Sequence, residues 1–424
     1  MPRIEVPSGI ATKIFILDDD ALPQLPSVLQ ELSAKARPWI LADGNTWLAA
    51  GKRVQEILTE AGMAPHEPLI LPAVPKPHPD YDLACKIAEE IPSGSIPVAV
   101  GSGVINDLLK TAAGIRNTPY CCVPTAPSVD GYTSKGSALS VNGSKKTVPC
   151  PAPAAVVADK NVLLSAPKEM AAAGFGDLAA KIVAGADWII ADAVKQDPIR
   201  PLVWDVVQKD LRSWLKDPRD LKAVFMGLAA TGYAMQMHDD SRPASGSEHL
   251  FSHVWEMEGL SFNGEEVSHG FKVSVGTVAT LRLMQFFLNT TVEEAMKLAT
   301  PPQQWNERKA DIDELLKRNC YGDSAAQFSR EKFLSPEETV IRRKEIYAVW
   351  NDLQQKVKVQ LGDPQELIAK LKAAGCPTEP EEIGLSKEQF LHGIFTAQLI
   401  RKRYNILDMF VETGLLDTAV KRMF

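Results

Sequence analysis

The feature that most constrains this chain is a change of pattern near residue 160. Before it, short apolar runs of strand length alternate with segments of helical spacing. After it, apolar residues recur at helical spacing almost to the C-terminus. Alternating strands and helices predict a parallel sheet with helices on both faces. We therefore expect an α/β, Rossmann-like N-terminal domain over 1–162 and an all-α, helical C-terminal domain over 163–424.

The apolar runs of the first part are bounded by turn-forming residues. The expected strands are 13–17, 38–42, 96–100, 119–123 and 154–158, with helices between them and a proline-rich connection over 64–79. Asn142-Gly143, between apolar runs at 138–141 and 146–148, predicts a hairpin because both residues tolerate positive φ. The expected helices of the second part are 178–194, 221–237, 250–259, 270–288, 336–361 and 390–415, and Ser335 is a candidate N-cap before Pro336.

Length and composition narrow the class of protein. A chain of 424 residues is too long for one ordinary domain. Its net charge of −7 argues against a nucleic-acid-binding surface. We find no apolar run approaching the roughly 20 residues that span a bilayer, and no secretory signal pattern. Six cysteines without a CxxC pair indicate reduced thiols, so we expect a cytoplasmic protein that does not bind membranes.

The helical part contains residues that suit a metal. Asp177, His249 and His269 lie in motif-like turns, and His253 lies one helical turn after His249. One carboxylate with two or three imidazoles suits a divalent metal with an open coordination position. The histidines could instead be core or capping residues. The same ligand types form the iron site of many oxygenases, but those sites belong mostly to β-barrel folds.

The first part contains a candidate dinucleotide site. The turn from Gly101 to Ile105 follows a strand and opens a helix, where backbone N–H groups can approach a pyrophosphate. Asp43 follows another strand and could accept hydrogen bonds from a ribose. Taken alone, the turn could be an ordinary tight turn and Asp43 a helix cap. The run from Pro124 to Ser134 follows a fourth strand and could be a stiff loop at the mouth of a binding crevice.

Taken together, these residues make the chain resemble the sn-glycerol-1-phosphate dehydrogenases. This family belongs to the superfamily of glycerol dehydrogenase, iron-containing alcohol dehydrogenases and dehydroquinate synthase. The matching runs are Ala42–Thr46, Gly101–Asp107, Pro124–Ser134, Ala173–Asp177, Gly246–His253, Ser268–Gly270 and the tail over 382–416. The length is closer to that of the bacterial branch, which implies a homodimer.

The resemblance implies a role for each matching residue. The metal, zinc or nickel with iron as a third option, would be bound by Asp177, His249 and His269. Asp130, Asp177 and His253 would contact substrate and take part in catalysis. NAD(H) or NADP(H) would be bound by Asp43, Gly101, Ser102, Gly103, Val104, Ile105, Thr125, Ala126, Pro127, Ser128 and Ser134. Ser102 stands where the family commonly has a third glycine.

The implied activity is the interconversion of dihydroxyacetone phosphate and sn-glycerol 1-phosphate. Three alternatives stay open: a lyase resembling dehydroquinate synthase, a dehydrogenase of an unphosphorylated polyol, and a nucleotide-binding regulatory protein. Cations for the substrate phosphate are not obvious from the sequence. The candidates are Lys135, Lys145, Lys146 and Arg242, but the interpretation as surface charges is favoured for each of them.

Overall fold

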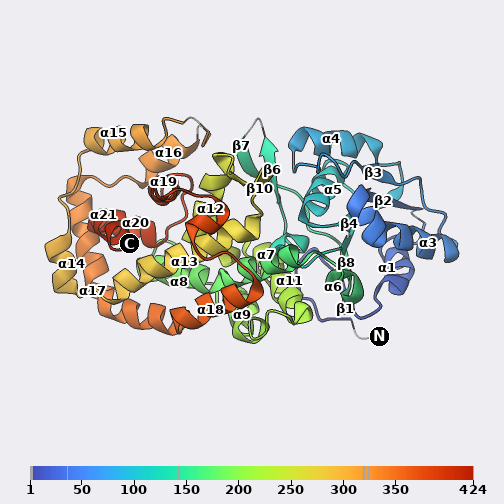
Figure 1. The fold of residues 1–424 in the computed structure, drawn as a ribbon, viewed down its shortest axis with the longest axis horizontal. Coiled ribbons are helices and arrows are strands. Elements are labelled where there is room, and N and C mark those ends of the chain that lie inside the picture. Colours follow the sequence, from blue (N-terminus) through green and yellow to red (C-terminus); the bar gives the residue numbers. More distant parts are fainter. Residues whose placement is uncertain (1–2, 36, 142–143, 319, 323, 424) are drawn as a thin grey trace. The chain divides into compact units, whose positions relative to one another are not determined.

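The protein is described by a computed structural model over residues 3–35, 37–141, 144–318, 320–322 and 324–423. Its main sheet has six strands in the order β1-β8-β5-β4-β2-β3, and all neighbouring pairs are parallel (Figure 1). The strands are β1 (Ile14–Asp18), β2 (Arg37–Asp43), β3 (Leu69–Leu71), β4 (Ser95–Gly101), β5 (Cys121–Pro124) and β8 (Ala155–Asp159). The predicted α/β architecture of the first part is confirmed.

The sheet also contains a strand that the sequence did not predict. β3 lies inside the supposed proline-rich connection and pairs with the end of β2 at one edge of the sheet. Three residues are too few to show a strand periodicity. A separate hairpin of β6 (Ser137–Val141) and β7 (Ser144–Val148) has the predicted location, and it pairs Val141 with Ser144. The turn residues Asn142 and Gly143 lie outside the described residues.

Helices connect the strands and form most of the remaining chain. Up to residue 238 they are α1 (Leu25–Leu32), α2 (Gly44–Thr46), α3 (Lys52–Glu60), α4 (Tyr81–Glu90), α5 (Gly103–Ile115), α6 (Lys160–Leu164), α7 (Lys168–Ala179), α8 (Lys181–Ala193), α9 (Pro201–Gln208), α10 (Leu211–Trp214) and α11 (Leu221–His238). The helix predicted over 178–194 is α8, which begins at Lys181; Leu178 and Ala179 form the end of α7.

The second half is mostly helical, as predicted. Its helices are α12 (Ser247–Met257), α13 (His269–Leu288), α14 (Val292–Leu298), α15 (Trp305–Leu315), α16 (Ser324–Lys332), α17 (Pro336–Leu361), α18 (Pro364–Ala374), α19 (Lys387–Ala397), α20 (Ile406–Thr413) and α21 (Leu416–Lys421). A small hairpin of β9 (Ser261–Phe262) and β10 (Glu265–Glu266) joins α12 to α13. The helix predicted over 390–415 is interrupted between Ala397 and Ile406, and Ser335 caps α17 as predicted.

The chain forms two compact units whose bounds do not follow the expected boundary at 162. The first contains Met1–Leu178 and Arg212–Asp240, and the second contains Ala179–Leu211 and Ser241–Phe424. The reason is visible in α11, where Phe225 stacks on Phe15 of β1 at 6.2 Å between ring centroids and Tyr233 meets the same ring edge-on. The other face of the sheet packs on α1 and α3 through residues such as Val28, Val54 and Val98. The division at 162 stays a prediction about domains.

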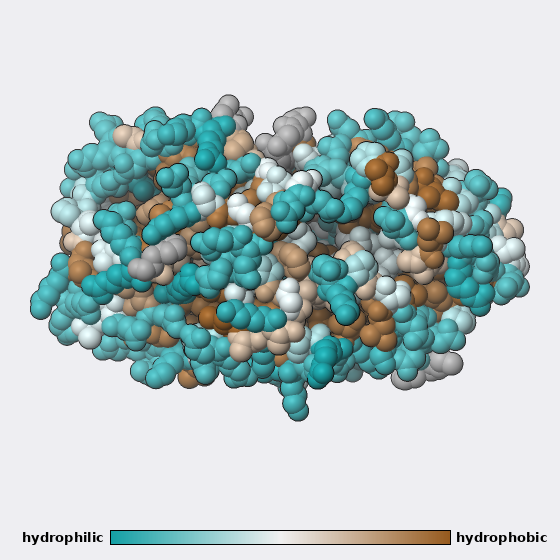
Figure 2. Space-filling view, viewed as in Figure 1, coloured by the Kyte–Doolittle hydropathy of each residue, from teal (hydrophilic) through white to brown (hydrophobic). Residues whose placement is uncertain are grey.

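Helix α13 corrects one expectation from sequence. It is long and apolar enough to cross a membrane by length and composition, although we expected no such segment among the apolar runs. However, 78% of its most apolar window is buried within the protein, which is typical of a core helix. In the view of Figure 2, hydrophilic residues predominate on the surface and hydrophobic ones form scattered spots.

Candidate metal centre

Helix α12 carries two of the predicted site residues, His249 and His253, and its start is fixed by buried polar contacts. One oxygen of Asp187 accepts hydrogen bonds from the Ser247 amide at 2.7 Å and the Ser247 hydroxyl at 2.8 Å. A side chain at Gly246 would lie 2.5 Å from Asp187 Oδ2, so only glycine fits there. The N-terminal turn of α12 is therefore held in one position within the second unit.

The other two predicted ligands lie at helix ends. His269 is the first residue of α13, and the Ser268 hydroxyl caps that helix by accepting from the Phe271 amide at 3.4 Å. Asp177 lies near the end of α7, and its Oδ2 accepts from the Asp130 amide at 3.0 Å. Helix α7 ends two residues later, at Ala179.

The structure brings the three predicted metal ligands together. One ligand atom each from Asp177, His249 and His269 lie within 4.8 Å of one another. Asp177 is fully buried, His249 is 6% exposed, and the His269 side chain is 30% exposed. This clustering of one carboxylate and two imidazoles is of the type that binds zinc or another first-row divalent metal.

The hydrogen bonds of the two imidazoles fit a metal site. His249 Nδ1 lies 2.7 Å from Glu248 Oε1, and His269 Nδ1 lies 3.0 Å from Glu256 Oε1. A carboxyl oxygen without a proton only accepts hydrogen bonds, so these contacts favour the tautomer of each ring that carries its proton on Nδ1. The Nε2 atom of each ring is then the one suited to bind a metal. A carboxylate behind each ligating histidine is a common arrangement in metal sites.

His253 is adjacent to the ligand group without being a member of it. Its ring centroid lies 6.0 Å from that of His269 and 6.3 Å from that of His249, and its Nδ1 lies 3.3 Å from Glu256 Oε2. Burial lowers the pKa of His253 to about 4, although Glu256 acts in the opposite direction. The imidazole is therefore neutral at pH 7 and could accept a proton on Nε2.

The carboxylate of Glu256 is kept ionised by its neighbours. Burial alone would raise the pKa of Glu256, but the charge of Lys272 and hydrogen bonds from His253 and His269 hold that pKa well below its usual range. Lys272 is 1% exposed, and its Nζ lies 3.3 Å from Glu256 Oε1. Sequence reasoning assigned no role to Glu248, which lies inside the matching run Gly246–His253, or to Glu256 and Lys272, which lie outside the matching runs.

The predicted dinucleotide turn has the geometry expected of a close backbone approach. It joins the end of β4 to the start of α5 within the first unit. A Cβ atom on Gly101 would lie 2.4 Å from Ile105 Cβ, and one on Gly103 would lie 2.9 Å from a methyl group of Val129. A larger residue at either position would therefore force a neighbouring side chain to shift. Ser102, between them, precedes the amino end of α5, where helix N–H groups favour an anion.

Asp43 is a helix cap, which was the alternative to a ribose-binding role. Its Oδ1 caps α2 by accepting from the Asn45 amide at 2.8 Å and the Thr46 amide at 2.9 Å. The residue is 7% exposed and lies at the carboxyl end of β2. The structure thus shows a helix cap, and a role in ribose binding stays a prediction.

The loop after β5 is tied down by its own side chains. The Tyr132 hydroxyl donates to the Ala126 carbonyl at 2.6 Å and lies 3.0 Å from Ser128 Oγ, and the Ser134 hydroxyl donates to the Gly131 carbonyl at 3.1 Å. The remaining predicted residues of the loop, Thr125, Ala126 and Pro127, are buried beside them.

Beneath this loop lies Lys110, a residue that the sequence analysis overlooked. Its side chain is fully buried, and Nζ donates to the carbonyls of Gly131 at 2.8 Å and Gly136 at 3.1 Å. It also donates to Ser134 Oγ at 3.2 Å and pairs with Asp107 at 3.1 Å. The i, i+3 spacing of Asp107 and Lys110 on α5 was the available signal.

The cations first considered for a phosphate are mostly engaged elsewhere. Arg242 is 1% exposed and donates to the carbonyls of Tyr404 and Asp187, both at 2.9 Å. Lys135 pairs with Asp239. Lys146 is exposed, and the side chain of Lys145 lies outside the described residues. Arg401, which the sequence analysis overlooked, is close enough to His253 for its charge to help lower the pKa of that imidazole.

Comparisons with known proteins agree with this fold. The family of iron-containing alcohol dehydrogenases matches residues 16–167. A solved structure of maleylacetate reductase from Agrobacterium tumefaciens superposes with a TM-score of 0.59 at 13% identity, over 100% of this chain and 99% of that one. The solved structure of glycerol dehydrogenase from Schizosaccharomyces pombe superposes with a TM-score of 0.54 at 14% identity, over 96% of this chain and 90% of that one. These likenesses confirm the predicted fold, that of the iron-containing alcohol dehydrogenases.

Sequence relatives are more specific. A protein of Geobacillus thermodenitrificans named glycerol-1-phosphate dehydrogenase (NAD(P)+) is 31% identical over 96% of this chain and 94% of its own length. One of Bacillus licheniformis with the same name is 35% identical over 63% of this chain and 68% of its own. The chain belongs to the glycerol-1-phosphate dehydrogenase family, as the sequence motifs predicted.

Proposed function

We propose that the protein is an NAD(P)H-linked, metal-dependent dehydrogenase that interconverts dihydroxyacetone phosphate and sn-glycerol 1-phosphate. The observation that carries this proposal is the group of Asp177, His249 and His269, with each imidazole backed by a carboxylate. Relatives named for this activity support it, including one aligned over nearly the whole chain. The overall reaction adds a hydride from NAD(P)H and one proton to the ketone.

Each side chain has a proposed task. Asp177, His249 and His269 hold one divalent metal, which when bound supplies Lewis-acid polarisation of the substrate oxygen. Asp130 and His253 contact the substrate, and neutral His253 exchanges a proton at Nε2. The dinucleotide is bound by Asp43, the turn from Gly101 to Ile105, the run from Thr125 to Ser128, and Ser134. We further propose that the enzyme is a cytoplasmic homodimer.

The substrate phosphate needs a cation, and we propose Arg401. It lies between α19 and α20, in a segment that Arg403 anchors by donating to the Ser245 carbonyl at 2.9 Å and the Ser241 hydroxyl at 2.7 Å. A guanidinium binds phosphate bidentately, which suits this task. If Arg401 has this role, Arg401→Met raises KM for dihydroxyacetone phosphate and leaves KM for dihydroxyacetone unchanged.

One alternative has an observation in its favour. Because Arg242 and Lys135 are engaged by other groups of the protein, an unphosphorylated polyol would also suit the metal centre. A substrate panel decides between the two. NADH and NADPH absorbance is followed with dihydroxyacetone phosphate, dihydroxyacetone and glyceraldehyde 3-phosphate, with and without Zn²⁺ or Ni²⁺. Metal-dependent oxidation only with dihydroxyacetone phosphate supports the proposal, whereas equal rates with dihydroxyacetone contradict it.

The same assay addresses the lyase alternative. A lyase that regenerates its NAD during each cycle would hold the cofactor tightly and show no net oxidation of NADH with any ketone of the panel. A regulatory protein would bind the dinucleotide without turnover on the panel. Either result would overturn the proposed activity while leaving the fold and family unchanged.

A further inference from the structure

We propose that Glu248 and Glu256 are positioning residues of the metal centre, each fixing one imidazole ligand through its Nδ1 atom. The carboxylate of Glu256 also contacts His253, so this one side chain orients both a metal ligand and the proposed substrate contact. This inference rests on the proposed function in one respect: it assumes that His249 and His269 bind the metal. It adds two residues to which the sequence motifs assigned no role.

Glu248 is held rigidly enough to orient a ring. It is fully buried, and its Oε1 accepts from the Gly246 amide at 2.8 Å as well as from His249 Nδ1 at 2.7 Å. Neighbouring residues of a helix do not normally face each other, so this contact depends on Glu248 folding back over the N-terminal turn of α12. The backbone of Glu248 is also pressed against α13, because a Cβ atom on Gly276 would lie 2.5 Å from the Glu248 carbonyl.

Glu256 joins two helices through its two oxygens. Oε1 accepts from His269 Nδ1 of α13 at 3.0 Å, and Oε2 accepts from His253 Nδ1 of α12 at 3.3 Å. The side chain is 7% exposed, so an unpaired charge there would be costly. Lys272, one helical turn after His269, provides the compensating charge at 3.3 Å. The carboxylate is therefore stable in this place without a metal, which makes it a fixed support.

The arrangement has two chemical effects. A hydrogen bond at Nδ1 prevents the ring from turning over and keeps Nε2 directed toward the metal. A negative charge behind the ring also makes Nε2 a stronger ligand. In metal sites generally, loss of such a partner weakens metal binding about 10–100-fold. We expect a decrease of that size for each glutamate.

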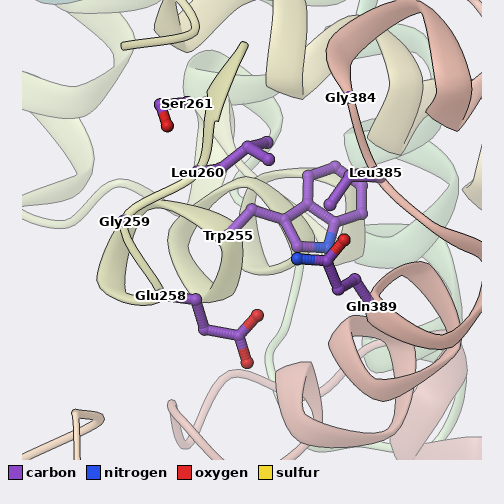
Figure 3. Close-up of a pocket in the computed structure, with 8 residues that line it drawn as sticks. All are labelled: Trp255, Glu258, Gly259, Leu260, Ser261, Gly384, Leu385 and Gln389. Carbon is purple, nitrogen blue, oxygen red and sulfur yellow. The ribbon is translucent and has the colours of Figure 1, made fainter. Parts of the chain in front are cut away.

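The test is Zn²⁺ affinity, measured on the metal-stripped full chain by competition with a chromophoric chelator. The variants are Glu256→Gln and Glu248→Gln, which keep size and hydrogen-bonding ability but remove the charge. The matched control is Glu258→Gln. Glu258 also lies buried at the end of α12, but it pairs with Arg318 at 3.2 Å and His392 at 3.1 Å. It lines a separate pocket of about 140 Å³ with Trp255 and Gln389 (Figure 3).

We expect Zn²⁺ to bind about 10–100-fold more weakly to both Gln variants and unchanged to Glu258→Gln. NADH affinity, followed by fluorescence, should stay at the wild-type value in all three, which a general loss of structure would not permit. Thermal unfolding of the metal-free proteins checks folding. If one Gln variant does not fold, the other decides, because each glutamate supports a different imidazole.

His249→Ala separates this inference from the proposed function. If His249→Ala loses Zn²⁺ binding while both Gln variants keep wild-type affinity, the positioning roles are wrong and the metal centre stands. If His249→Ala binds Zn²⁺ as tightly as the wild type, the proposed metal centre itself is wrong. Weaker Zn²⁺ binding in both Gln variants and in His249→Ala supports both the positioning roles and the metal centre.

Discussion

The two units use buried charge in opposite ways. In the first unit, the cation of Lys110 binds two backbone carbonyls and a hydroxyl, so it shapes a loop. In the second unit, the carboxylate of Glu256 binds two imidazoles and an ammonium, so it orients side chains. If the proposed roles hold, the comparison teaches that a loop binding a dinucleotide needs its backbone fixed, whereas a metal centre needs its ligand rings fixed.

The largest effect is expected when the buried cation of the first unit is removed. Lys110→Met leaves the Gly131 and Gly136 carbonyls and Asp107 without their buried partner. We expect the free energy of unfolding to fall by about 3–5 kcal/mol and NADH binding to weaken. Denaturant unfolding and NADH fluorescence measure the two effects.

The control for Lys110→Met is Lys135→Met. The ion pair of Lys135 with Asp239 is exposed, so its loss should change stability by about 0.5 kcal/mol or less. If Lys110→Met were as stable as this control and bound NADH normally, the loop would not depend on the buried cation.

Stability measured over a range of pH adds a second buried carboxylate to the comparison. Glu412, also in the second unit, is less strongly stabilised in its charged form than Glu256. Burial raises the pKa of Glu412 to about 7, although the Tyr404 hydroxyl donates to it at 2.6 Å. A carboxyl whose pKa is higher in the folded state stabilises most below its unfolded value and loses that contribution as pH rises to about 7. We expect the wild type to lose up to about 3 kcal/mol of stability between pH 4.5 and 7 through this group.

Glu412→Gln should remove that part of the pH dependence in urea unfolding of the metal-free protein. The matched control is Glu345→Gln, in which an exposed glutamate of α17 that pairs with Arg342 is neutralised. Equal pH dependence in Glu412→Gln and the wild type would show that Glu412 is ionised in the folded state as easily as in the unfolded state.

A smaller effect is expected where α7 meets the loop after β5 within the first unit. A Cβ atom on Gly174 would lie 1.7 Å from the Pro127 carbonyl oxygen, so Gly174→Ala must move that backbone. We expect a loss of about 1–3 kcal/mol in stability and weaker NADH binding. Gly131→Ala, where the added atom would make only contacts of 3.8 Å, should behave like the wild type. Similar results for both variants would argue against a tightly fitted loop.

Much of this structure could be predicted from the sequence, because local patterns determined it. Five of the six strands of the sheet follow from apolar runs, and the glycines at 101 and 103 follow from the turn between strand and helix. The three metal ligands lie in recognisable motifs, and the structure brings them together. Their roles in binding and catalysis stay predictions.

Other parts depended on packing between distant segments. The Glu256–His269 contact requires α12 and α13 to lie side by side, which no local pattern indicates. Helix α11 packs on the sheet through the contact of Phe225 with Phe15, two residues that lie far apart in the sequence. The strand β3 was too short to detect, and Asp43 serves as a helix cap whatever else it binds.

The most direct test of the central claim is the metal dependence of turnover at this site. Metal-stripped wild type and His269→Ala are mixed with NADH and dihydroxyacetone phosphate, and the nicotinamide absorbance is followed before and after Zn²⁺ or Ni²⁺ is added. We predict no oxidation without metal, recovery in the wild type when metal is added, and no recovery in His269→Ala. Equal turnover in the stripped wild type, or full recovery in His269→Ala, would contradict the assignment of this site as the catalytic metal centre.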